Sequence, residues 1–221
     1  MSKLHVITTY WNPIGYRSRR ALYEQFRKRM ADDRVELHTI ELSTDERGFE
    51  VTHNDDPRHI QVRSADQLWY KENLINIAVR ALPADWEFAA WVDADVAFVR
   101  PDWADQAMEE LRHHAFVQLF THVVDLGPQY EPLETQDGFA YGWVKSGRQS
   151  SGWFGQPGGA WAVTRDAFEQ VGGLIDWSIM GSNDYFAALG LTGGIEPEKT
   201  RMPGSTYATM LLDWQNRCEQ S

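Results

Sequence analysis

Two aspartates form the clearest candidate for chemistry in this sequence. Asp93 and Asp95 are separated by one residue and follow the apolar run 88–92. Side chains two residues apart project to the same side of an extended chain, and burying carboxylates is costly unless a cation or a donor satisfies them. Hard divalent cations bind carboxylate and phosphate oxygens. The pattern therefore favours a metal site for a diphosphate at a strand end over a turn with two solvated aspartates.

The elements that must position this pair alternate between strand and helix. Hydrophobic periodicity predicts strands over 4–10, 35–42, 88–92 and 115–120, and helices over 18–30, over 67–82 and from 101 onward. This alternation indicates an α/β fold with a mostly parallel central sheet flanked by helices. Ligands bind such sheets at the carboxyl ends of strands. Residues 8–10 and 93–95 are both expected there.

Two longer segments interrupt the alternation. The polar segment 43–65 is predicted to be a loop, and residues 125–160 combine many glycines with tyrosine, tryptophan and phenylalanine. A long glycine-rich loop in a compact domain is usually functional or disordered, and abundant aromatic residues argue against disorder. We expect the part over 127–156 to be mobile and to become ordered over a bound donor.

Composition limits the class of protein. The chain has 221 residues and a net charge of −11, so one domain is expected and a general nucleic-acid coat is not. The single cysteine, Cys218, excludes an internal disulfide and favours a reducing compartment. Without a signal peptide or a long apolar run in the sequence, a cytoplasmic protein with no membrane span is expected.

Several motifs in order resemble one enzyme family. They are Lys71-Glu72-Asn73-Leu74-Ile75-Asn76, Leu82-Pro83, Trp91-Val92-Asp93-Ala94-Asp95, Gly158-Gly159-Ala160-Trp161-Ala162 and Gly181-Ser182-Asn183-Asp184. Together, over roughly residues 4–190, they resemble the GT-A-fold (DXD-motif) glycosyltransferases of the family 2 type. The resemblance implies a single Rossmann-like GT-A domain over 1–221, with a nucleotide-binding half at 1–122 and an acceptor-binding half at 123–221.

The resemblance also implies an activity and a set of site residues. The activity would be metal-dependent transfer of a sugar, of the hexosyltransferase type, from a nucleotide sugar such as a UDP-sugar to an acceptor hydroxyl. Asp95 and Asp93 would bind Mn²⁺ or Mg²⁺, and Asp93 would also contact the donor ribose. The remaining donor-binding residues would be Thr8, Tyr10, Trp11, Arg17, Lys71, Asn76, Gly158, Gly159 and Trp161.

Some of these residues have structural alternatives. Tyr10 and Trp11 are equally well explained as core aromatic residues. Lys71 lies on the apolar stripe of its helix, where its stem would pack while the ammonium reaches water or a diphosphate. Asn76 would either hold the base or tie its helix to the first strand.

Asp184 is the candidate general base. It begins a short helix that is predicted to end at Gly190. An inverting transferase needs one carboxylate to accept the proton of the acceptor hydroxyl. A carboxylate that caps the helix would occupy the same place in the sequence, so both roles stay open.

The sequence departs from the family in two respects. Many metal-dependent members supply a late histidine ligand, whereas the last histidine here is His122, and the chain ends soon after Leu212-Asp213-Trp214. A minimal enzyme or a C-terminal truncation would explain this. Two alternatives follow, namely a non-catalytic nucleotide-sugar or carbohydrate-binding protein and a transferase acting on a hydroxymethylated DNA base. Only the basic residues within 17–29 favour DNA.

A nucleotidyltransferase is disfavoured, because residues 8–13 contain no glycine-rich basic loop. The donor sugar, the acceptor (glycan, small molecule or modified DNA base) and the stereochemistry stay open.

Overall fold

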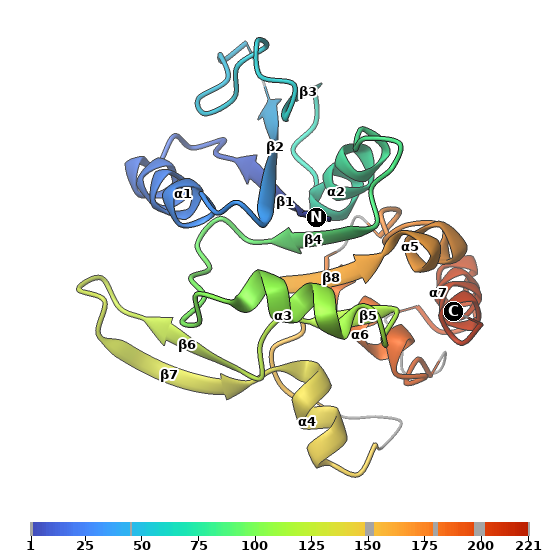
Figure 1. Ribbon diagram of the computed structural model, residues 1–221. Helices are drawn as coiled ribbons and strands as arrows, with labels where there is room; N and C mark the ends of the chain where they lie inside the picture. The colour runs from blue at the N-terminus through green and yellow to red at the C-terminus, as the bar shows by residue number, and fades with distance from the viewer. Residues whose placement is uncertain (1, 45, 149–152, 179–180, 197–201, 221) are drawn as a thin grey trace.

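A six-stranded sheet lies at the centre of the computed structural model, which describes residues 2–44, 46–148, 153–178, 181–196 and 202–220 (Figure 1). Its strands run in the order β3-β2-β1-β4-β8-β5. The strands are β1 (Leu4–Trp11), β2 (Val35–Thr44), β3 (His59–Ser64), β4 (Phe88–Val92), β5 (Phe116–Gln118) and β8 (Ala160–Thr164). The first four in this order are parallel to one another, and β8 is antiparallel to both β4 and β5. The predicted α/β fold with a mostly parallel sheet is confirmed.

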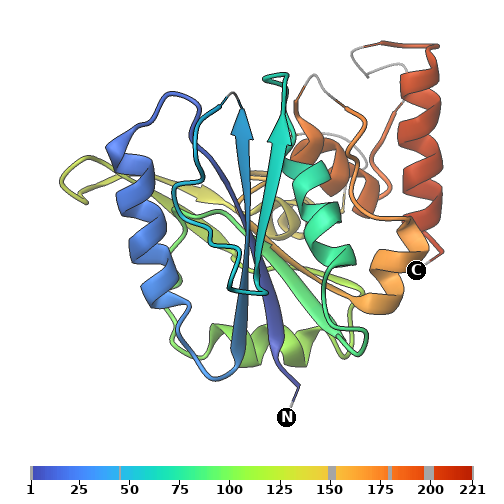
Figure 2. The same cartoon turned by 90° about the horizontal axis from the view of Figure 1, so that it is seen from above.

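Helices cover both faces of this sheet (Figure 2). They are α1 (Arg17–Arg29) and α3 (Trp103–Glu110) on one face, and α2 (Lys71–Arg80) and α5 (Arg165–Val171) on the other. Alternation along the strands sends Val6 and Ala90 towards α1 and α3, whereas Ile7 and Ala89 pack against α2 and α5. Each face of the sheet therefore has its own hydrophobic core.

Local signals fix where α5 begins and ends. The side chain of Thr164 accepts a hydrogen bond of 3.3 Å from the backbone N–H of Ala167 and so caps the first turn. Gly172 then adopts a left-handed conformation with φ 76°, which a glycine takes up without strain, and ends the helix.

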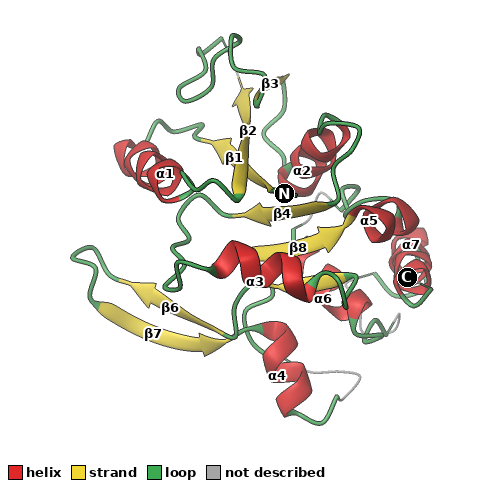
Figure 3. Cartoon of the chain, in the orientation of Figure 1, coloured by secondary structure: helices red, strands yellow, loops and turns green. Residues whose placement is uncertain are grey.

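The second half of the chain adds a hairpin and further helices to this sheet (Figure 3). These elements are β6 (His122–Leu126), β7 (Pro132–Asp137), α4 (Phe139–Lys145), α6 (Asn183–Leu191) and α7 (Thr206–Cys218). The prediction of one long loop over 125–160 is therefore wrong. The strands β6 and β7 form a separate two-stranded sheet, and α4 follows directly. Residues 149–152 of the predicted mobile segment 127–156 lie outside the described residues.

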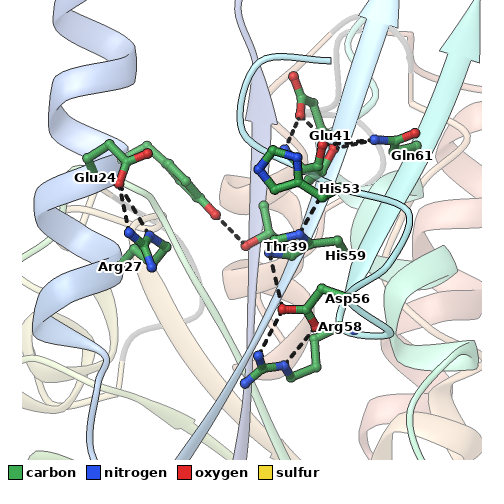
Figure 4. A network of polar contacts seen from close by, with 11 residues as sticks. Glu24, Arg27, Thr39, Glu41, His53, Asp56, Arg58, His59 and Gln61 are labelled. Carbon is green, nitrogen blue, oxygen red and sulfur yellow. Dashed lines mark hydrogen bonds and ion pairs between the residues drawn. The ribbon is translucent and has the colours of Figure 1, made fainter. Parts of the chain in front are cut away.

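The predicted loop over 43–65 contains a strand, β3, that pairs in parallel with β2. A polar network holds the rest of this segment on the sheet (Figure 4). The carboxylate of Glu41 accepts hydrogen bonds from the backbone of residues 50–52, and Asp56 forms a 2.8 Å ion pair with Arg58. The sequence pattern missed this strand because polar side chains dominate it, and its stability comes from pairing and from this network.

No helix among the described residues is long and apolar enough to cross a bilayer.

Candidate active site

Asp93 and Asp95 lie in a tight turn at the carboxyl end of β4. The backbone N–H of Val96 donates to the carbonyl of Asp93 at 3.0 Å, so the pair is not extended as the sequence pattern suggested. The backbone N–H of Asp93 donates to Gly159 at 2.8 Å. This bond continues the antiparallel register in which Val92 pairs with Ala160. The Gly158–Gly159 turn is thus brought beside the aspartates by strand pairing.

Lys71 forms an ion pair with Asp93. Its Nζ lies 2.5 Å from Oδ1 of Asp93, and the two side chains are 21% and 34% exposed. Lys71 is the first residue of α2, whose N-terminus points towards this end of the sheet. Burial is the largest single influence and opposes the lysine charge, but the Asp93 carboxylate, together with Glu72 and Asp184, outweighs it and raises the pKa of Lys71. The ammonium therefore stays charged and fixed beside the turn.

Asp95 presents its carboxylate at the surface of the same turn. The surrounding protein still desolvates it in part, and this effect, together with the negative charge of Asp93, raises the pKa of Asp95. A cation between the two carboxylates would relieve both effects. In the described part of the chain, no third histidine, cysteine, aspartate or glutamate joins them in a three-ligand cluster. The pair thus fits a hard cation that takes its other oxygen ligands from phosphate and water.

Glu72 is a buried acid that the sequence analysis did not select. Its Oε2 accepts hydrogen bonds from Asn183 at 2.8 Å and from Trp69 at 3.0 Å. Burial is the main cause that raises the pKa of Glu72. One sequence signal would have found it, because Glu72, Ile75 and Val79 share the buried stripe of α2 at helical spacing. The Glu72–Asn183 contact joins the N-termini of α2 and α6.

Asp184 lies in the first turn of α6, next to Asn183. Its Oδ1 accepts a 2.8 Å hydrogen bond from the backbone N–H of Tyr185, and its Oδ2 faces Gly158. A Cβ atom at Gly158 would lie 2.7 Å from Oδ2, so this close approach requires glycine. The N-cap position itself is occupied by Ser182. Asp184 therefore supports the helix through one oxygen and directs the other towards the β8 turn.

A small cavity of about 30 Å³ lies between α2, α6 and the sheet, next to the Asp93–Asp95 turn. Its polar lining consists of Lys71, Glu72, Asn183 and Asp184, and most of its other lining residues are aromatic or aliphatic, including Trp91 and Trp214. The Oδ1 of Asn183 is buried and has no partner among the described residues. The cavity has room for roughly two water molecules. Of the predicted residues, Lys71, Gly158, Gly159, Trp161 and Asp184 line it.

Two predicted donor-binding residues are engaged in the protein itself. The Nε1 of Trp161 donates to the carbonyl of Pro157 at 2.7 Å, so the buried ring shapes the cavity wall. The amide of Asn76 donates to the carbonyl of Leu174 and to Asp176, and it accepts from the N–H of Leu174. Asn76 therefore ties α2 to the segment after α5, and not to β1.

The predicted nucleoside residues of β1 lie on opposite faces of the sheet. Tyr10 packs against Tyr23 of α1, and alternation places Thr8 on the same side, whereas Trp11 packs against the cluster on the α2 side. The OH of Tyr10 donates to Glu50 at 2.7 Å. The pKa of Tyr10 is raised, mainly because the side chain is buried. Arg17 is exposed at the start of α1. Of Thr8, Tyr10 and Trp11, therefore, Trp11 alone lies on the α2 side of the sheet, where the cavity is.

Unpaired polar atoms mark the carboxyl edge of β1 and β2. The Nε1 of Trp11 and the Oγ1 of Thr44 are buried and have no partner among the described residues, and the same holds for the Oγ1 of Thr8. Unsatisfied buried polar atoms are rare in native proteins. Thr44 was not among the residues predicted from sequence, because a threonine at a strand end carries no distinctive pattern.

Comparison with known proteins gives little independent information. No protein-family model matches the sequence, and no curated protein matches it significantly. A crystal structure from Desulfovibrio desulfuricans G20, provisionally described as a nucleotide-diphospho-sugar transferase, aligns with 100% of this chain and 98% of its own. The two chains are 12% identical and superpose with a TM-score of 0.40. This likeness is too low to support an inference about activity.

Proposed function

We propose that this protein is a metal-dependent glycosyltransferase that moves a sugar from a nucleotide-sugar donor, UDP-linked, to an acceptor hydroxyl. One observation carries the proposal. Lys71 and Asp184 line one cavity at the carboxyl end of the sheet. The turn with Asp93 and Asp95 lies beside this cavity, joined to its lining by the Lys71–Asp93 ion pair and by the bond from Asp93 to Gly159. The carboxylates of the turn suit a cation, the ammonium suits a diphosphate, and the carboxylate of Asp184 suits an acceptor hydroxyl that must lose its proton.

The donor diphosphate would lie over the Asp93–Asp95 turn. Asp95, with Asp93, would hold Mn²⁺ or Mg²⁺, which when bound neutralises the departing diphosphate as a Lewis acid. Lys71 has three N–H donors. It keeps Asp93 in place and offers further donors to phosphate oxygens. The N-termini of α2 and α6 add favourable partial positive charge for an anion at this edge.

The nucleoside would extend towards β1 and β2 on the α2 side. There Trp11 supplies an aromatic surface and an unpaired N–H, and Thr44 supplies an unpaired hydroxyl. The sugar would sit at the mouth of the cavity, because a cavity of about 30 Å³ holds water but no hexose. The buried Oδ1 of Asn183 has no partner among the described residues, so it would accept a hydrogen bond from a water molecule in the cavity below the sugar.

Asp184 would accept the proton of the acceptor hydroxyl at Oδ2. Its Oδ1 is held by the N–H of Tyr185, so the carboxylate orientation is fixed before substrate binds. The neighbouring Asn183 is itself held by Glu72, which positions the start of α6 against α2. Preorganisation of this kind lowers the entropic cost of bringing the base and the hydroxyl together.

Thermal denaturation with UDP and Mn²⁺ tests the proposal. Both together should raise the melting temperature by about 5–10 °C at concentrations near 100 times Kd, and neither should do so alone. Asp95→Asn should abolish this shift and lower transfer at least ~100-fold, because it removes a direct ligand of the cation. Asp213→Asn, an exposed carboxylate on α7, is the matched control.

A screen of nucleotide-sugar hydrolysis then separates an enzyme from a binding protein. A shift with UDP and Mn²⁺ but no hydrolysis of any nucleotide sugar would support the non-catalytic alternative. No shift under any of these conditions would contradict the proposal.

A further inference from the structure

Three potential metal ligands meet at the opposite end of the sheet, near the amino-terminal ends of the parallel strands. They are His5 on β1 and Glu36 and His38 on β2, and their ligand atoms all lie within 4.8 Å of one another. His5 pairs with Glu36 in the parallel register of the two strands. Alternation places His38, two residues further on, on the same face as Glu36. Two adjacent strands therefore bring the three side chains to one point.

The separations match those of ligands around a common ion. The Nδ1 of His5 lies 3.1 Å from the Nε2 of His38, and that Nε2 lies 3.7 Å from the Oε1 of Glu36. Two atoms bound at 2.0–2.1 Å to a tetrahedral ion lie about 3.3–3.4 Å apart. Both separations are within a few tenths of an ångström of this value, and the third, between His5 and Glu36, is within 4.8 Å. Binding an ion would therefore mainly draw the Glu36 carboxylate towards the histidines.

Without an ion, the carboxylate of Glu36 has no hydrogen bond to either His5 or His38. One imidazole donates to the other at 3.1 Å, but 3.7 Å is too long for a hydrogen bond from His38 to Glu36. The histidines are 8% and 6% exposed, whereas the Glu36 side chain is 29% exposed. Burial lowers the pKa of both imidazoles, so each offers a lone pair at neutral pH.

We propose that His5, His38 and Glu36 bind a divalent transition-metal ion, with Zn²⁺ the ion to test, and that this ion clamps β1 to β2. Two imidazoles and one carboxylate are a ligand set for zinc, completed by water from the solvent side next to Glu36. Magnesium and calcium prefer oxygen ligands throughout. Without an ion, one of the two facing nitrogens, Nδ1 of His5 or Nε2 of His38, carries a proton. When the ion binds, that proton moves to the other nitrogen of the same ring, so that both facing nitrogens can bind the ion.

This site is separate from the proposed active site. His5 is adjacent to Ala89 in the register of β1 and β4, and Asp93 follows four residues later in the chain. At about 3.3 Å per residue this is roughly 13 Å along the sheet. The ion would therefore contribute to the stability of the sheet and not to sugar transfer.

Zinc binding to chelator-stripped protein tests the proposal. The Asp95→Asn variant is the background, so that the proposed active-site cation does not contribute. Equilibrium dialysis with Zn²⁺ should give one ion per chain. Saturating Zn²⁺ should raise the melting temperature by about 5–10 °C near 100 times Kd. Replacement by Co²⁺ should give the visible absorption of a four-coordinate nitrogen–oxygen site.

Glu36→Gln is the decisive variant, because its side chain is partly exposed and keeps its size in this substitution, so the core and the histidine pair stay intact. Losing a group that merely orients a ligand costs about 10- to 100-fold in metal affinity, so losing a direct ligand should cost at least about 100-fold. His38→Gln should abolish binding, and His113→Gln, which is exposed on the loop after α3, should not change it. Absence of saturable Zn²⁺ binding, or unchanged binding in Glu36→Gln, would overturn the proposal.

Discussion

Asp184 uses its two carboxylate oxygens for different purposes. Oδ1 accepts from the backbone of Tyr185, and Oδ2 faces Gly158 and the cavity. The alternatives of base and helix cap, which the sequence left open, therefore concern different oxygens of the same side chain. Substitutions that keep one oxygen acceptor can separate them.

Asp184→Asn should lower transfer by about 10²–10⁴-fold, the usual contribution of a general base. The amide oxygen of asparagine can still accept from Tyr185, so the melting temperature and the UDP–Mn²⁺ shift should both stay at parental values. Single-turnover transfer and thermal denaturation measure the two effects. A variant that melts earlier but transfers at the parental rate would make Asp184 a structural residue. Loss of donor binding would assign it to the sugar site.

Glu72 should make the protein less stable as pH rises through the acidic range. Burial raises its pKa in the folded state, so the native protein keeps this proton at pH values where the unfolded chain has lost it. Its contribution is therefore most favourable below the unfolded pKa and declines as pH rises from there to the folded pKa. Asp95, whose pKa is also raised, contributes with the same sign.

Glu72→Gln should remove this part of the pH dependence, because glutamine does not titrate and its oxygen can still accept from Asn183. Urea unfolding between pH 4 and pH 8 should show a flatter stability profile for this variant than for the parent. Glu134→Gln, an exposed glutamate on β7, should reproduce the parental profile. Equal slopes for the parent and Glu72→Gln would mean that Glu72 is ionised in the folded protein throughout this range.

At the scale of elements, the turn before β8 and the start of α6 are in direct contact. Asp93 bonds to Gly159, and Gly158 approaches Asp184, so this turn lies between the proposed metal site and the proposed base. Gly159 has φ 90°, which glycine adopts without strain. The distance between the two carboxylate groups therefore depends on a turn without side chains.

Gly158→Ala tests this contact. Its Cβ would lie 2.7 Å from the Oδ2 of Asp184, so the carboxylate or the turn must shift. Because a misplacement of about 1 Å can cost about 100-fold in rate, transfer should fall by about 10- to 100-fold while UDP–Mn²⁺ binding persists. Gly48→Ala, which meets nothing within 4 Å, is the control. Parental transfer by Gly158→Ala would argue against Asp184 as the base.

At the scale of the whole molecule, the two halves of the chain share one sheet. The strand β8, from the second half, lies between β4 and β5, which both come from the first. Residues 1–122 alone would therefore lack the strand that joins β5 to the rest of the sheet. The division into 1–122 and 123–221 describes the chain order, and we expect the halves not to fold separately.

A fragment of residues 1–122 should show no cooperative thermal transition, because β4 and β5 would lose β8, the strand to which both are hydrogen-bonded. The full chain should unfold in one step, with coincident transitions by near-ultraviolet and far-ultraviolet circular dichroism. Calorimetry of both proteins checks the expectation. A fragment with its own cooperative transition would identify the first half as an independent domain.

The sequence predicted the strongly periodic elements well. The strand at 88–92 has the predicted bounds, and the helix predicted to start at Asp184 spans Asn183–Leu191. It failed over 43–65 and 125–160, where β3, the β6–β7 hairpin and α4 form. These strands are mostly polar and exposed or half-buried. Cross-strand pairing stabilises them, and a single-sequence pattern does not contain their partners.

By itself, the sequence determined the α/β class and the position of Asp93 and Asp95 at a strand end, because burial periodicity and chain order are local properties. The tertiary structure decided which distant groups meet. Antiparallel insertion of β8 brings Gly158 and Gly159 to the aspartates, and the Glu72–Asn183 contact joins α2 to α6.

The tertiary structure also decided the meeting of His5 and His38, which are 33 residues apart and come together through the parallel register of β1 and β2. Register and packing depend on long-range contacts, and residue spacing along the chain does not encode them.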